Sequence, residues 1–165
     1  MKGFENQTYL IAYIISNIVA LILLLCAWKW PRVGRLLFFL LFAWAAWVNW
    51  ALAVQTPQAY LDYADLTFSG WYKQFILGWF KDHTLLAVGF IATSQGLIAL
   101  SLLQKGLVYK IGCIGGVVFL LAIMPFGVGA AFPCTLVMAA ALYRLLRHGQ
   151  DYIWKIEKHE KLQWQ

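Results

Sequence analysis

The side chains that most often act as nucleophiles or metal ligands lie far apart along this sequence. His83, His148 and His159 fall on different segments, without the H-E-x-x-H spacing of a metalloprotease helix. The cysteines lack the C-x-x-C spacing of a zinc or redox site; they are Cys26, Cys113 and Cys134. Phosphate-binding and nucleophile-elbow motifs do not occur either. The sequence therefore predicts no metal site, no cofactor and no catalytic residues.

Titratable side chains gather in one stretch only, together with two tyrosines. This stretch holds Asp62, Asp65 and His83, and a membrane enzyme would need these three to converge on one pocket. Their spacing matches no nucleophile or metal motif, and ordinary polarity at a membrane surface explains them better. The sequence thus favours a protein that is not an enzyme, with the enzyme as the alternative.

Three amide side chains are the strongest polar candidates outside that stretch, because each lies within a long apolar run. They are Asn17, Asn49 and Gln95. An amide in hydrocarbon seeks a partner on a neighbouring helix, so all three predict a polar cluster inside a bundle. One interpretation is hydrogen bonds that hold helices together. The other is a set of polar groups in an apolar ligand cavity, such as a quinone or lipid would need.

The elements that position these amides follow from composition. Of the 165 residues, 62% are hydrophobic and 12% are charged, and such a chain cannot form the polar shell of a soluble domain. The net charge of +6 does not indicate nucleic acid, because the basic residues lie between apolar runs and form no stripe. We therefore predict an all-α, polytopic transmembrane helical bundle, with the lipid bilayer as its main partner.

The gaps between charged residues predict the membrane spans. Three apolar blocks each suit one helix of about 20 residues, which crosses a hydrocarbon core of about 30 Å. A fourth block, residues 111–143, is too long for one crossing, and Pro125, Gly127, Gly129 and Pro133 predict a break within it. The alternative is a kinked helix that ends in a re-entrant piece. The five predicted spans are residues 9–28, 36–54, 84–103, 107–124 and 131–146.

The distribution of Lys and Arg predicts the orientation. With five spans, ten of the 13 basic residues fall on one side, and only Lys2, Lys73 and Lys81 on the other. The positive-inside rule then places the amino terminus outside and the carboxyl terminus in the cytoplasm of a bacterial-type inner membrane. Residues 1–146 form the bundle in this prediction, and residues 147–165 form a basic amphipathic tail in the cytoplasm.

Small residues mark a packing face in the third predicted span. Gly89, Ala92, Gly96 and Ala99 recur at helical spacing and so share one side of the helix. Small side chains let helix backbones approach closely in membranes. This side should therefore face other helices, with Gln95 at its edge.

The outer segment, residues 56–82, is too polar to span a membrane and too aromatic to lie free in water. Its apolar residues, including Trp71 and Trp79, recur at helical spacing. This pattern predicts an amphipathic helix that caps the outer face of the bundle. Trp71 and Trp79 would then roof a cavity between the first three spans.

Residues 95–106, a helix that ends in a turn with Lys105 and Gly106, resemble the central helical pair of DoxX-like membrane proteins. Leu102 and Leu103 keep the spacing to Gly106 that is typical of that family, and Gln95 stands where the family often has Glu. The resemblance covers residues 84–146. It implies a small accessory subunit of a quinone-linked membrane complex.

Two functions follow as expectations. The first is a non-catalytic accessory or assembly subunit, with other membrane subunits or further copies of the chain as partners. The second is a binder or carrier of an apolar small molecule, for which Asn17, Asn49, Gln95, Trp71 and Trp79 would line the cavity.

Overall fold

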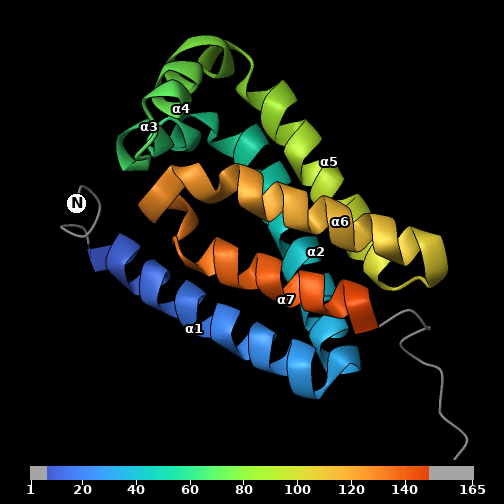
Figure 1. Ribbon diagram of the computed structural model, residues 1–165. Coiled ribbons are helices and arrows are strands. Elements are labelled where there is room, and N and C mark those ends of the chain that lie inside the picture. Colours follow the sequence, from blue (N-terminus) through green and yellow to red (C-terminus); the bar gives the residue numbers. More distant parts are fainter. Residues whose placement is uncertain (1–6, 149–165) are drawn as a thin grey trace, which may run out of the picture.

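The computed structural model describes residues 7–148, and that part of the chain is helical with no strand (Figure 1). Four helical stretches are long and apolar enough to cross a membrane, which indicates a membrane protein. They are α1 (Gln7–Lys29), α2 (Pro31–Gln55), α5 (Thr84–Leu102), and Gly106–Ala130, which joins α6 (Gly106–Ile123) to the 3₁₀ helix η3 (Met124–Ala130). The first three predicted spans and the fourth agree with these helices to within a few residues.

Helix α5 packs along α2, and α7 (Cys134–His148) packs between α1 and α6 (Figure 1). The pairs α1–α2 and α5–α6 each have a connection of only a few residues, so the chain turns back between their helices, whereas residues 56–83 connect α2 to α5. The main buried core lies where α1, α2, α5, α6 and α7 meet. It includes Phe38, Leu102, Tyr109, Leu142 and Leu145.

The segment α7, which corresponds to the predicted fifth span, is short for a membrane crossing. Its 15 residues rise about 22 Å, and it is not among the stretches long and apolar enough to cross on their own. Asn17 Nδ2 donates to the carbonyl of Ala131 at 3.1 Å. Because Asn17 lies about 15 Å along α1 from Gln7, α7 begins beside the middle of α1 and not beside its first residues.

The break between α6 and α7 differs from a tight turn. Residues Met124–Ala130 form η3 instead, and the helix is kinked at Gly127, which has a φ of 63°. A Cβ atom at Gly127 would lie 2.7 Å from the Phe68 ring. Only glycine therefore allows both this backbone conformation and the close approach of Phe68.

The predicted single amphipathic helix in residues 56–82 is not found; short helical pieces replace it. These are η1 (Pro57–Tyr60), α3 (Tyr63–Leu66), α4 (Gly70–Phe75) and the π-helical turn η2 (Ile76–Phe80). The helix is interrupted at Thr67, which is extended, and at Gly78, whose φ and ψ are not helical. We call η1, α3, α4 and η2 together the roof, because they cover one end of the bundle (Figure 1).

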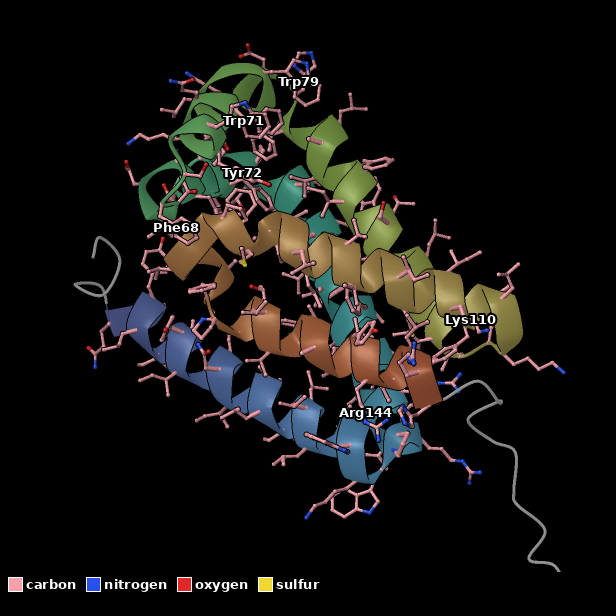
Figure 2. The ribbon with its side chains drawn as sticks, in the orientation of Figure 1. Phe68, Trp71, Tyr72, Trp79, Lys110 and Arg144 are labelled. Atoms are coloured by element: carbon pink, nitrogen blue, oxygen red, sulfur yellow. The ribbon has the colours of Figure 1, made fainter. Side chains whose placement is uncertain are left out.

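Charge separates between the two ends of the described chain. Its three carboxylates, Asp62, Asp65 and Asp82, belong to the roof and its connection to α5. Most basic residues lie at the other end, as Lys110 and Arg144 illustrate in Figure 2. The predicted tail from residue 149 onward lies outside the described residues.

One basic residue at that end is buried. Arg35 is 2% exposed, and its guanidinium donates to the carbonyls of Leu102 at 2.8 Å and Gln104 at 2.6 Å. It also lies 4.0 Å from the centre of the Tyr109 ring. Arg35 therefore joins the start of α2 to the end of α5, where its positive charge also complements the helix dipole.

Candidate functional site

The helices α5 and α6 form a V that opens toward the roof (Figure 1). They touch near their connecting turn because α6 carries glycines there. A Cβ atom at Gly112 would collide with Ser101, and one at Gly115 would lie 3.6 Å from Ile98. Beyond this contact α6 carries the bulky Phe119, so the helices separate.

A cavity of about 710 Å³ occupies the open part of the V. Its walls come from α2, α5, α6 and η3, and the roof closes it at one end. Nine of its twenty lining residues are aromatic. The volume falls within the range of about 300–1,000 Å³ that is typical of small-molecule sites.

A chain of hydrogen bonds runs along one wall of the cavity. The Tyr60 hydroxyl donates to Asn49 Oδ1 at 2.8 Å, and Asn49 Nδ2 donates to Gln95 Oε1, also at 2.8 Å. These bonds join the roof, α2 and α5. All three residues line the cavity, so the polar groups are concentrated on one side of an otherwise apolar space.

Three hydroxyl groups fasten the roof to the bundle. Besides Tyr60, the Tyr72 hydroxyl donates to the carbonyl of Ala122 in α6 at 2.6 Å. Thr67 Oγ1 donates to the carbonyl of Pro125 in η3 at 2.6 Å. Each hydroxyl satisfies a polar group that would otherwise face an apolar surrounding. Figure 2 shows Tyr72 among the roof aromatics over the end of α6.

Aromatic side chains stack along the roof at a spacing of four residues. Trp71 stacks on Phe75 with ring centres 5.8 Å apart, Phe75 on Trp79 at 5.8 Å, and Trp79 on His83 at 4.7 Å. Phe75 and Trp79 also line the cavity. The stack thus forms an ordered, largely apolar cover over the open end of the V.

The environment of Tyr60 disfavours its charged form. Burial, and to a smaller extent the neighbouring Tyr63, raise the pKa of Tyr60 from 10.0 to about 12. The hydroxyl therefore stays protonated over the ordinary pH range. It can remain a donor to Asn49 throughout that range.

The structure brings together only part of the predicted site. Asn49, Gln95 and Trp79 line the cavity. Asn17 does not join them, because α1 packs on α7. The side-chain amide of Asn17 donates to the carbonyls of Tyr13 and Ala131 instead. Trp71 is 68% exposed and stacks on Phe75 without lining the cavity.

The predicted packing face of α5 lies against α2 over part of its length. Ala92 and Ala99 are 1% exposed, and a Cβ atom at Gly89 would approach the Trp50 ring to 3.0 Å. The nearest atom to such a Cβ at Gly96 would be the Ala46 Cβ, at 3.9 Å. This contact fixes α5 on α2 and so brings Gln95 within reach of Asn49.

The titratable residues considered for an enzyme have separate surroundings. Asp65 forms an ion pair with Lys73 at 3.0 Å, and His83 Nδ1 lies 2.9 Å from the carbonyl of Trp79. The three cysteines are buried and free. Within residues 7–148, no three His, Cys, Asp or Glu side chains group as metal ligands.

Sequence reasoning missed the glycines of α6 and the aromatic wall that faces α5. The signal was present as Gly112, Gly115 and Gly116, followed by Phe119. Small residues on one half of a helix and a large one on the other predict close approach at one end only. Which helix the glycines would contact could not be read from the sequence.

No protein-family model, curated protein or solved structure matches this chain. Function must therefore be inferred from the site itself.

Proposed function

We propose that this protein binds a small apolar molecule of the bilayer in the cavity between α5 and α6. The observation that carries this proposal is a cavity of about 710 Å³ whose lining is predominantly apolar. Its size suits a molecule of drug-like dimensions. Its polar groups are few, and the amides of Asn49 and Gln95 lie together on one wall, as a site that orients a ligand requires.

The rim of the cavity supports entry from the lipid side. Leu86 and Phe90 of α5 belong to the lining, yet they are 67% and 75% exposed. Large apolar side chains exposed on a membrane-spanning helix face lipid. An apolar molecule would then pass between α5 and α6 without crossing water, while the roof covers the end of the cavity.

This proposal includes five crossings of a bacterial-type inner membrane, with the amino terminus outside. The position of α7 supports the fifth crossing. It begins beside Ala131 on the roof side and ends where the Tyr109 hydroxyl donates to the Leu145 carbonyl, near the connection of α5 and α6. The basic residues then lie in the cytoplasm, and the packing of α1, α2 and α6 around α7 compensates for its short length.

The role of an accessory or assembly subunit that the DoxX-like resemblance implies stays a prediction. A membrane subunit can bind an apolar molecule and contact other subunits, so the two functions are compatible. Native mass spectrometry after gentle detergent extraction would detect a partner polypeptide or a further copy of the chain.

Photolabelling with an apolar phenyl diazirine in lipid nanodiscs tests the binding function. Residues that line the cavity should be labelled saturably, because a site has a fixed capacity. Residues that face lipid should be labelled in proportion to the probe concentration. Labelling of the 119–130 region that never saturates would contradict the proposal.

A matched pair of variants locates the site. Ala122→Trp places a large side chain in the lining of the cavity and should abolish saturable labelling. Val118→Trp adds the same side chain one turn earlier on α6, at a position that is 61% exposed and outside the lining, and should preserve it. Equal saturable labelling of both variants would place the bound probe elsewhere.

A further inference from the structure

We infer that the cavity selects a neutral molecule whose apolar skeleton carries a hydrogen-bond-accepting oxygen, as in a ketone or an ester, and that Gln95 Nε2 is the donor. This inference rests on the proposed function and adds the chemical class of the ligand. It follows from the direction of the hydrogen bonds along the cavity wall.

The direction is set at Tyr60. Its hydroxyl oxygen lies 2.8 Å from Asn49 Oδ1 and 3.3 Å from the Asn49 carbonyl, so the proton goes to the nearer acceptor. Asn49 then presents Nδ2 to Gln95 Oε1. Both side-chain oxygens of this chain are thereby used as acceptors by protein donors.

On this chain of hydrogen bonds, the amide nitrogen of Gln95 is the donor that remains unpaired. Gln95 is 5% exposed and lines the cavity. Among residues 7–148, Nε2 makes no hydrogen bond, whereas Oε1 is paired with Asn49. An unpaired donor in an apolar site favours any ligand that supplies an acceptor.

Charged ligands are disfavoured by the remaining lining. None of the cavity residues within the described chain is Asp, Glu, Lys, Arg or His. A carboxylate or phosphate would lose its hydration without gaining a counter-charge. Of the other two phenols in the lining, Tyr72 already bonds to the Ala122 carbonyl, whereas the Tyr63 hydroxyl makes no hydrogen bond within residues 7–148 and lies apart from the amide chain.

Three matched probes test this selectivity: dibenzyl ketone, the corresponding hydrocarbon and the corresponding alcohol. Each competes with the phenyl diazirine in nanodiscs, and its concentration is expressed as mole fraction in the lipid. The ketone should compete about tenfold better than the hydrocarbon, the effect of one well-formed hydrogen bond. The alcohol should fall below the ketone, since its own proton must be buried beside amide oxygens that already accept one hydrogen bond each.

The double variant Asn49→Leu, Gln95→Leu removes the donor together with Asn49 Nδ2, which Gln95→Leu alone would leave unpaired in the cavity. It should reduce the advantage of the ketone to less than about twofold and leave competition by the hydrocarbon unchanged. Saturable diazirine labelling reports whether the variant keeps its cavity. Thr93→Val, a change on α5 outside the lining, should behave as the wild type.

The outcomes separate this inference from the proposed function. Saturable labelling with equal competition by ketone and hydrocarbon would overturn the donor role of Gln95 and leave the binding function intact. An alcohol that competes better than the ketone would show that the amides face the cavity with an oxygen, which also overturns it. Absence of saturable labelling would overturn both.

Discussion

Tyr60 connects the roof to the polar wall of the cavity, and its hydroxyl sets the direction of the whole hydrogen-bond chain. The ring stacks on Tyr63 and meets Phe80 edge to face. The Tyr60→Phe variant keeps these ring contacts and leaves Asn49 Oδ1 without its donor. We expect a loss of about 1–2 kcal/mol in the free energy of unfolding.

Denaturation in detergent measures this loss. The matched control is Tyr143→Phe, because Tyr143 is 55% exposed and its hydroxyl makes no hydrogen bond within residues 7–148. Its free energy of unfolding should stay within about 0.5 kcal/mol of the wild type. Equal effects of the two substitutions would show that the hydrogen bond from Tyr60 to Asn49 does not stabilise the fold.

The raised pKa of Tyr60 also predicts a pH dependence. The folded protein keeps this hydroxyl protonated up to about pH 12, whereas the unfolded chain ionises near 10.0. Its contribution to stability is thus complete below pH 10 and is lost as pH rises toward 12. Stability measured across this window should fall more steeply for the wild type than for Tyr60→Phe, and parallel curves would contradict the burial of this hydroxyl.

At the scale of elements, the shape of the site depends on where α5 and α6 touch. The closest approach is at Gly112, where a Cβ atom would collide with the Ser101 Cβ. At Gly115, one turn further, a Cβ would lie 3.6 Å from Ile98, an ordinary contact distance. The two glycines therefore offer a matched pair on one helix.

We expect Gly112→Ala to lower the free energy of unfolding by about 1–3 kcal/mol, because the helices must move apart. Gly115→Ala should be neutral or stabilising by up to about 1 kcal/mol, since alanine favours the helix. Thermal unfolding in one detergent measures both. If Gly112→Ala proves as stable as Gly115→Ala, α5 and α6 do not meet as described.

The long helices were predictable because the gaps between charges define them directly. The short elements were not. Helical spacing of aromatics in the roof predicted one amphipathic helix. The pattern does not reveal that Thr67 is extended or that the helix is kinked at Gly78. Likewise, Pro125 and Pro133 predicted a break, while the form of η3 depends on Phe68 packing against Gly127.

The site could be predicted only in part, because its hydrogen bonds depend on which helices pack side by side. Asn49 and Gln95 are polar residues in apolar helices, which marks them in the sequence, but their pairing depends on which helices pack together. Asn17 carries the same mark and yet bonds to Ala131, because α1 packs against α7. Similarly, the charge pattern does not reveal that Arg35 is buried, because its contacts with Leu102, Gln104 and Tyr109 depend on how α2 packs beside the connection of α5 and α6.

At the scale of the whole molecule, the separation of charge predicts which end faces the cytoplasm. The native cysteines are buried, so single cysteines introduced on the surface can be labelled selectively. Asp62→Cys in the roof should react with a membrane-impermeant maleimide on intact cells. Gln104→Cys, between α5 and α6, should react only after permeabilisation.

The residue His148 tests the fifth crossing, because it ends α7. His148→Cys should behave like Gln104→Cys if α7 returns to the basic end. Reaction of His148→Cys on intact cells, together with Asp62→Cys, would mean that α7 does not cross. The helix inventory would then have to be revised.

The most direct test of the account is native mass spectrometry of the protein released from nanodiscs made with lipids of the native membrane. We predict that the wild type and Val118→Trp carry an apolar small molecule, and that Ala122→Trp loses it because the new side chain occupies the cavity. The same small molecules retained in the same amounts by all three proteins would contradict a binding cavity between α5 and α6.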